Sequence, residues 1–265
     1  MLTLRRSIRF AIPPGGSSAD ISKTPNSYAA NPSPQGFDHH FEIALTCKGE
    51  PDPMLGYLLD IKVIDEAARH TAIHILRDAI AKQRQPISII HPLLAAISPR
   101  LDHKLIALRL NLNPFCSLEA STSMPTTVLM RQRFDFAASH RLHVPSLSPE
   151  ENRKAFGKCN HESGHGHNYQ FEPCIAVDVS TAAPAFTLQH LESIVEEVLI
   201  QHYDHKHLTI DTPEFNPEKG GVNSSVENIS RVFFEKIAPH IAAAGARLHS
   251  IRVWETDRTS AEYSA

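Results

Sequence analysis

One short segment of this chain holds a cysteine and two histidines at a spacing that suits a metal ion. Cys159 precedes His165 and His167, and a single glycine separates the two histidines. Because alternate side chains of an extended strand point to the same face, both imidazoles can reach one ion. An earlier apolar stretch supplies a third imidazole, that of His140. Three histidines without a fourth protein ligand are typical of an open, catalytic zinc site.

The same residues also have simpler interpretations. His165 and His167 could be surface histidines on a glycine-rich loop, and His140 alone would more often be a capping or core residue. Cys159 could instead be a fourth ligand, which would close the site and make it structural. The residue types alone leave these alternatives open.

Composition describes an ordinary globular protein. The 265 residues are 42% hydrophobic and 21% charged, values typical of a chain with a packed core. The net charge of -3 gives no reason to expect nucleic acid or a membrane surface as a partner. No apolar run approaches the roughly 20 residues of a membrane span, and the start lacks the apolar core of a signal peptide. Four cysteines without paired spacing suit a reducing compartment, so we predict a cytoplasmic protein.

The elements that must position the histidines follow the order strand, strand, helix, helix, strand in the second half. Apolar residues alternate in both early strands, although Pro173 marks an edge or a bulge in the second of them. Helical spacing starts at Leu188, and Ser224 to Glu227 resembles a capping box that opens the second helix. The predicted strands are 133–140, 169–179 and 251–255.

The first half repeats this order, with strands at 41–47 and 105–112 around a helical stripe from 61 to 75. A Ser/Thr/Pro-rich link at 117–125 separates the halves. A Pro/Gly/Ser-rich stretch from 13 to 35 is predicted to be a long mobile loop.

The two halves of the predicted repeat differ in their candidate catalytic and metal-binding residues. Aligning the first half with the second places Pro14, Phe37 and Leu112 at the positions of His140, His165 and Glu255. His39 falls on His167, and no cysteine falls near Cys159. We therefore predict that the first half keeps the scaffold and has lost the chemistry.

Five motifs of the second half occur in an order that identifies a family. They are Phe136-Ala-Ala-Ser-His140-Arg-Leu, Gly157-Lys-Cys159-Asn with Gly164-His165-Gly-His167-Asn-Tyr, Tyr203-Asp204-His205-Lys206-His207-Leu208, Ser225-Val-Glu227-Asn228 and Val253-Trp-Glu255-Thr256. Over about residues 131–263, the chain resembles the 6-pyruvoyl-tetrahydropterin synthase and 6-carboxytetrahydropterin synthase family.

The resemblance implies an α+β protein built from the tunnelling fold (T-fold), an antiparallel four-stranded sheet with two helices on one face. We expect two tandem modules, a degenerate one at 1–122 and a catalytic one at 123–265. The family also implies homo-oligomers, with trimers that close the sheets into a barrel and active sites at subunit interfaces.

Matching positions imply a role for each site residue. His140, His165 and His167 would bind Zn²⁺, Cys159 would be the general base, and Asp204 with His205 would complete a proton relay. Glu255 would anchor the pterin ring, helped by Ser225 and Glu227. Val226 replaces a threonine of the animal synthases and has no hydrogen-bond donor, so one side-chain contact to the pterin is expected to be missing.

The expected substrate is 7,8-dihydroneopterin triphosphate. Zinc would act as a Lewis acid on the hydroxyl oxygens of its side chain, and the thiolate of Cys159 would abstract a proton. Triphosphate would then leave, with Arg141, Lys158 and Lys206 as candidate contacts. Asp204 would orient His205, as acids orient histidines in hydrolase triads.

Several alternatives remain for the reaction. Five residues separate Cys159 from His165, a spacing that favours the pyruvoyl-forming enzymes of tetrahydrobiopterin biosynthesis. The alternative is the carboxy-forming enzyme of queuosine biosynthesis, which releases acetaldehyde. A non-catalytic module that binds pterin or metal would not need the cysteine or the Asp-His pair. A zinc hydrolase would need a glutamate base that the chain does not offer at the expected place.

Overall fold

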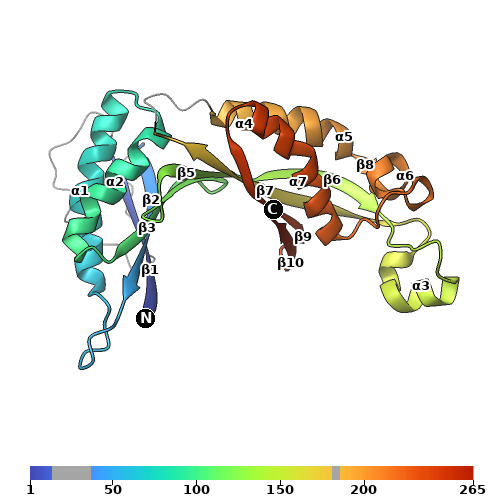
Figure 1. Ribbon diagram of the computed structural model, residues 1–265, viewed down its shortest axis with the longest axis horizontal. Helices are drawn as coiled ribbons and strands as arrows, with labels where there is room; N and C mark the ends of the chain where they lie inside the picture. The colour runs from blue at the N-terminus through green and yellow to red at the C-terminus, as the bar shows by residue number, and fades with distance from the viewer. Residues whose placement is uncertain (14–36, 181–185, 265) are drawn as a thin grey trace. The chain divides into compact units, whose positions relative to one another are not determined.

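A computed structural model describes residues 1–13, 37–180 and 186–264 of the chain (Figure 1). The chain divides into two compact units, Met1–Met130 with Asp178–Ala183 and Arg131–Val177 with Pro184–Ala265. Both units combine β-strands with helices, so the protein is a mixed α+β protein. The domain boundary between residues 122 and 123 stays a prediction, and the predicted loop lies outside the described residues from residue 14 onward. No helix in the described ranges is long and apolar enough to cross a membrane.

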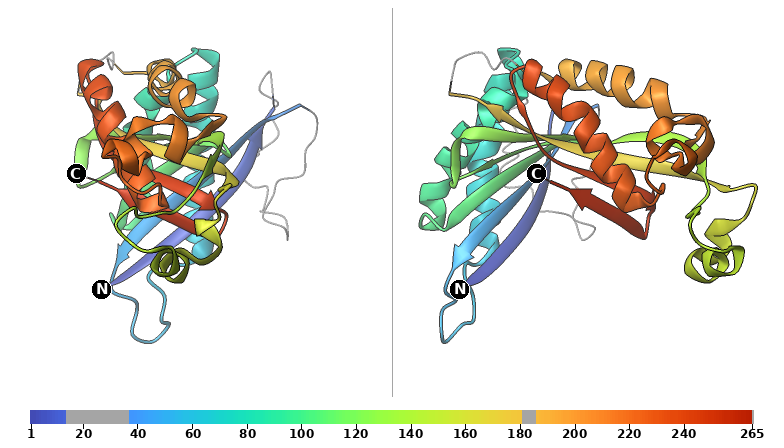
Figure 2. Two further views of the ribbon diagram at one scale, coloured as in Figure 1. Left: turned by 90° about the vertical axis from the view of Figure 1, so that its right-hand side faces the viewer. Right: turned by 45° about the vertical axis from the view of Figure 1, so that its right-hand side comes forward.

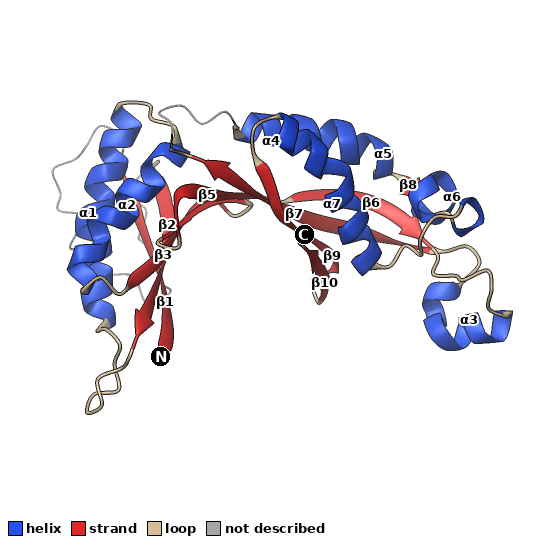
Figure 3. Cartoon of the chain, viewed as in Figure 1, coloured by secondary structure: helices blue, strands red, loops and turns tan. Residues whose placement is uncertain are grey.

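The first unit pairs its first four strands in sequence order, each antiparallel to the next. Helices α1 and α2 lie on one face of this sheet (Figure 3). Alternate residues of the first strand, among them Ile8 and Phe10, are fully buried, as a strand with one covered face requires. Its elements are β1 (Leu2–Ile12), β2 (His39–Gly49), α1 (Ile61–Ala81), η2 (Pro86–Ile89), α2 (Ile90–Ile97), η3 (Ser98–Leu101), β3 (Leu105–Asn113), β4 (Cys116–Ser121) and β5 (Met124–Gln132).

The segment expected as an open link at 117–125 instead forms β4, a turn and the start of β5. Ser117 and Ser121 are buried, and Ser117 accepts a hydrogen bond from Nε of Arg109 at 2.9 Å. The small polar residues that suggested a linker therefore belong to a strand that pairs with β3.

The second unit forms a sheet with strand order β8-β6-β7-β9-β10, in which β8 is parallel to β6 and the other pairs are antiparallel. The irregularity expected at Pro173 is a shift in the β7–β9 register between Cys174 and Ile175. The strands are β6 (Phe134–His140), β7 (His165–Asp178), β8 (Lys206–His207), β9 (Arg247–Thr256) and β10 (Thr259–Tyr263).

Helix α7 covers one face of this sheet (Figure 2). The ring of Phe233 lies 5.4 Å from that of Phe136 and 5.5 Å from that of Phe171, so aromatic contacts fix the helix over β6 and β7. The helical elements are α3 (Pro149–Phe156), η4 (Gly157–Asn160), α4 (Leu188–Val195), the π-helical η5 (Glu196–Ile200), α5 (Gln201–Tyr203), α6 (Leu208–Asp211), η6 (Pro213–Phe215), η7 (Pro217–Lys219) and α7 (Val226–Ala243).

Helix α7 begins one residue later than the capping box predicts. Its N-cap is Ser225, whose hydroxyl accepts a hydrogen bond from the backbone N–H of Asn228. Ser224 is fully buried instead, and its backbone carbonyl contacts Nδ1 of His140. Glu227 is therefore an exposed residue of the first turn and not the reciprocal member of a capping box.

Helix α3 is absent from the predicted elements, although the sequence signals it clearly. Ser148 and Glu151 form a capping box with Pro149 at the first helical position, a common pattern at helix starts.

Candidate active site

Three imidazoles converge where β6 ends and β7 begins. His140 is the register partner of His165, and Ala138 is that of His167, so the antiparallel pairing brings all three histidines together. Nε2 of His140 lies 3.1 Å from Nε2 of His165. One nitrogen from each ring lies within 4.8 Å of the other two, an arrangement that could hold a metal ion.

His140 is held as a neutral ring. It is fully buried, and its burial lowers the pKa to about 4. Its Nδ1 lies 2.8 Å from the carbonyl oxygen of Ser224 and 3.3 Å from the hydroxyl of Tyr169. Because the carbonyl can only accept, Nδ1 carries the hydrogen, and the lone pair of Nε2 faces the other two histidines.

The donor set fits zinc. Tetrahedral Zn–N bonds of about 2.0–2.1 Å place two ligating nitrogens about 3.3 Å apart, close to the separation of His140 and His165. Nε2 of His167 is buried and has no hydrogen-bond partner among the described residues. A bound ion would satisfy this nitrogen, which otherwise costs free energy.

Cys159 is not a member of this group of three. Its segment, η4, is tied to the residues that follow β6, because the backbone N–H of Leu142 donates to the carbonyl of Cys159 at 2.9 Å. Asn160 donates to the carbonyl of Leu142 at 2.7 Å, and Nε of Arg141 donates to the carbonyl of Asn160 at 3.1 Å. These bonds tie the segment of the half-buried Cys159 to the residues that directly follow His140.

Asp204 and His205 form an ordered acid–imidazole pair. Nδ1 of His205 lies 2.7 Å from one oxygen of Asp204, and the other oxygen accepts the backbone N–H of Ala137 at 2.8 Å. The hydrogen bond from Ala137, with a smaller effect of His205, lowers the pKa of Asp204. His205 adopts a φ of 56° and its side chain is 83% exposed, so the pair presents an oriented imidazole to solvent.

Three residues for which the sequence predicted a role and one neighbour, His207, share a shallow pocket of about 450 Å³. His167, His205, Lys206 and His207 all line it.

Glu255, near the end of β9, reaches the histidines directly. Its Oε1 lies 3.5 Å from Nε2 of His140 and 3.6 Å from Nε2 of His167. These distances are too long for hydrogen bonds, but they place a carboxylate at the edge of the three-histidine group.

The other two predicted substrate contacts lie at the start of α7. Ser225 caps that helix, and Glu227 is exposed on its first turn. Val226 between them is 7% exposed and belongs to the core. The position at which a side-chain contact to the pterin was expected to be missing therefore serves packing in this chain.

Sequence reasoning missed two groups that contact His140. Tyr169 continues the alternation of His165 and His167 along β7, so its place on the same face could have been predicted. Burial raises the pKa of Tyr169, and the charges of Glu255 and Cys159 act in the same direction. Ser224 acts through its backbone carbonyl, which any residue would supply, so no residue type could have signalled it.

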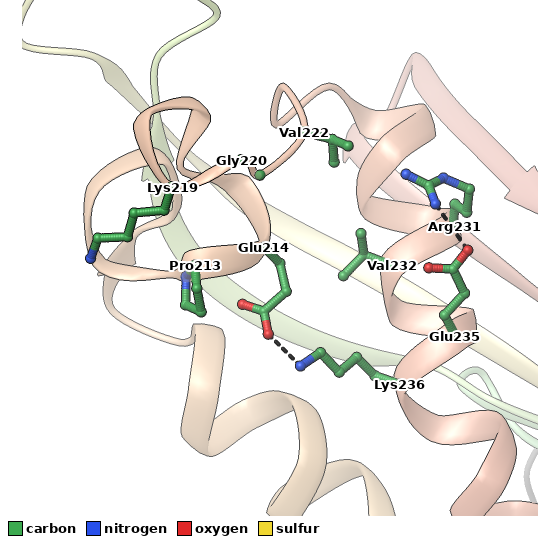
Figure 4. Close-up of a pocket in the computed structure, with 10 residues that line it drawn as sticks. Pro213, Glu214, Lys219, Gly220, Val222, Arg231, Val232, Glu235 and Lys236 are labelled. Carbon is green, nitrogen blue, oxygen red and sulfur yellow. Dashed lines mark hydrogen bonds and ion pairs between the residues drawn. The ribbon is translucent and has the colours of Figure 1, made fainter.

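A second pocket, of about 400 Å³, lies between α7 and the segment 213–222 (Figure 4). Glu214 forms an ion pair with Lys236, and Glu235 with Arg231 at 2.9 Å. None of the predicted site residues lines this pocket, and these four charged side chains pair with one another. It is therefore not the candidate site.

Comparison with known proteins identifies the family. The family model for 6-pyruvoyl tetrahydropterin synthase matches residues 129–265. The chain therefore belongs to the 6-pyruvoyl tetrahydropterin synthase family through its second half.

Named relatives agree with this assignment. The chain is 36% identical to human 6-pyruvoyl tetrahydrobiopterin synthase over 133 residues, which cover 50% of this chain and 88% of the human protein. It is 33% identical to the Dictyostelium discoideum protein of the same name, over 53% of this chain and 98% of that protein. The structure of Caenorhabditis elegans 6-pyruvoyl tetrahydropterin synthase is similar at 31% identity and a TM-score of 0.47, over 52% of this chain and 96% of that chain.

Proposed function

We propose that the second unit converts 7,8-dihydroneopterin triphosphate to 6-pyruvoyl-tetrahydropterin with loss of triphosphate, as a lyase. The observation that carries the proposal is the convergence of three imidazoles beside the Cys159 segment. Relatives that match this half of the chain are named 6-pyruvoyl tetrahydrobiopterin synthases, which supports the choice of reaction.

His140, His165 and His167 would hold Zn²⁺, since three neutral imidazoles are typical ligands of catalytic zinc. Zinc bound there would supply Lewis-acid polarisation of the hydroxyl oxygens on the substrate's side chain. The hydrogen bond from His140 to Ser224 would orient the first ligand, as outer-sphere partners do in metal sites.

Cys159 would act as the general base on the side chain. The bonds that tie its segment to Leu142 and Arg141 would fix the thiol relative to the carbon that loses its proton. A positioned base contributes about 10²–10⁴-fold to a rate.

Asp204 would orient His205, which would carry protons to and from the reacting side chain. The two oxygens of Asp204 are committed to Ala137 and His205, so the imidazole has one favoured orientation and its other nitrogen is free to exchange protons with the substrate. The exposure of His205 is compatible with a site that is completed by another subunit.

Glu255 would bind the pterin ring by accepting hydrogen bonds from its guanidine-like edge. Its partial exposure of 22% leaves it accessible to a ligand, and its position beside His140 and His167 would place the ring next to the metal. Ser225 and Glu227 would add contacts from the start of α7. Among the cationic candidates for triphosphate binding, Arg141 already uses Nε for Asn160.

We further propose that the chain is a tandem pair of T-fold modules, degenerate at 1–122 and catalytic at 123–265, which assembles into homo-oligomers. In both units two long strands precede the main helices and further strands follow them, which supports this architecture. Within the described residues, β1 pairs only with β2 and β10 only with β9, so each leaves an edge that another chain could cover. The cytoplasmic location stays a prediction.

Product analysis tests the reaction. Purified chain, zinc and dihydroneopterin triphosphate should yield triphosphate and a pterin that keeps all three side-chain carbons, as seen by mass spectrometry. Stoichiometric acetaldehyde would instead assign the carboxy-forming reaction of queuosine biosynthesis. A chain that binds pterin and zinc without turnover would be a binding module.

A further inference from the structure

His207 is a half-buried residue next to the candidate site, and the proposed reaction does not use it. Its backbone N–H donates to Asp211 at 2.7 Å. Both nitrogens of its ring are buried and have no hydrogen-bond partner among the described residues. Buried polar atoms without partners are rare and costly, so the position of this ring calls for an explanation other than hydrogen bonding within the described residues.

The strand register places His207 behind the metal-binding segment. Strand β8 runs parallel to β6 with His207 opposite Ser139, and Ser139 in turn pairs with Gly166 of β7. Register partners point to the same face of a sheet. The ring therefore lies across β6 and the start of β7, on the face opposite to the side chain of His140.

Gly164 and His207 are complementary in shape. A side-chain carbon at Gly164 would lie 2.7 Å from Nε2 of His207 and 2.7 Å from the carbonyl oxygen of His140. Both distances are shorter than van der Waals contact allows. Gly164 also has a φ of +67°, a conformation that glycine adopts without strain. The missing side chain at Gly164 leaves the space in which the ring of His207 lies.

We propose that His207 is a positioning residue for the metal site. Its ring fills the space beside Gly164, fixes the turn from which β7 starts, and so sets the position of His165 relative to His140. Because neither ring nitrogen has a partner among the described residues, the shape of the ring carries this effect and not its hydrogen bonding. The proposal rests on the proposed function in one respect, that these histidines hold zinc.

Zinc affinity of the full chain, measured by competition with a chromogenic chelator, tests this role. His207→Ala should weaken zinc binding about 10–100-fold, the usual effect of losing a group that orients a metal ligand. His207→Phe keeps a planar ring and should bind zinc within about threefold of wild type. The matched control is His202→Ala, which removes an exposed histidine and should change nothing.

Stability and spectra separate positioning from general packing. In metal-free protein, His207→Phe should unfold at the same or higher denaturant concentration than wild type, because an apolar ring replaces unpaired polar atoms. Cobalt-loaded His207→Ala should show shifted visible absorption bands, whereas cobalt-loaded His207→Phe should match wild type. If His207 had a structural role alone, His207→Ala would lower stability and leave the zinc affinity and the cobalt spectrum of the folded protein unchanged.

A second pair of variants covers the case in which His207→Ala does not fold. Gly164→Ala should weaken zinc binding at least about tenfold. In the double variant Gly164→Ala/His207→Leu, the fold-loss of zinc affinity should be smaller than the product of the losses in the two single variants, since the two positions compete for one space. The proposal fails if His207→Phe loses zinc as His207→Ala does, if His207→Ala keeps wild-type affinity, or if the two positions act independently. A wild-type chain that binds no zinc would overturn the proposed function instead.

Discussion

Nδ1 of His140 lies 2.8 Å from the carbonyl oxygen of Ser224, a residue 84 positions away in the chain. This single contact joins the end of β6 to the residue before the N-cap of α7. It fixes the tautomer of His140 and leaves Nε2 to face His165 and His167. The start of α7 is thereby brought to the three-histidine group.

The roles of cysteine and histidine can be separated by metal content. Cys159→Ala should retain zinc and lose turnover by about 10²–10⁴-fold, because the thiol lies outside the three-histidine group and would act as a base. His165→Ala should lose zinc as well as activity. Elemental analysis of both purified variants checks this, and a zinc-free Cys159→Ala protein would show that the cysteine is a ligand.

Glu255 should matter far more for pterin binding than Glu227. Losing a charged hydrogen bond costs about 1.5–3 kcal/mol, so Glu255→Gln should weaken binding of a pterin without the triphosphate by roughly 10–150-fold. Glu227→Gln should change it by less than about threefold, because Glu227 is exposed on the first turn of α7. Fluorescence titration measures both, and equal losses would contradict the ranking.

Stability of the metal-free chain should fall in mild acid. The pKa of His140 is about 4 when folded, against 6.5 for the free side chain, so the unfolded chain takes up this proton first as the pH falls. The contribution is complete above pH 6.5 and is lost between pH 6.5 and 4, by up to about 3 kcal/mol. The pKa of His165 is also lowered by burial and acts in the same direction.

Denaturant unfolding at a series of pH values, with a chelator present, measures this loss. His140→Gln cannot gain a proton, so its unfolding free energy should depend less on pH in this range. Identical slopes for wild type and His140→Gln would show that other groups cause the effect.

Each chain should bind one zinc ion. Within the described residues, the only group of three or more candidate ligands is that of His140, His165 and His167. Phe37, which the predicted repeat aligns with His165, is fully exposed, and neither Phe37 nor Leu112 has a metal-binding side-chain atom. Elemental analysis should give one zinc per wild-type chain and none for His165→Ala/His167→Ala. Two tightly bound ions per wild-type chain would contradict the loss of chemistry in the first half.

Local patterns in the sequence were sufficient to predict most elements and part of the site. Alternating apolar residues indicated β6 and β7, and helical spacing indicated α1 and α7. His165 and His167 share a face because the side-chain period of a strand is two, a rule that needs no knowledge of the rest of the chain. The order of the five motifs along the chain indicated the family without reference to any tertiary contact.

The predictions that failed depended on contacts between distant residues. The segment 117–125 has the composition of a linker, yet β3 pairs with β4 and buries its serines. Ser224 looked like a helix cap by its spacing to Glu227, whereas burial beside His140 moved the cap to Ser225.

The sequence alone determined which residue types are available for chemistry and which of them share a strand or helix face, because these follow from backbone periodicity. Only the tertiary structure decided that Glu255 lies within 3.6 Å of two histidines, that His140 is kept neutral by burial, and that His207 lies against Gly164. Such distances are set by strand register and helix packing, which sum interactions over the whole unit and which no local pattern records.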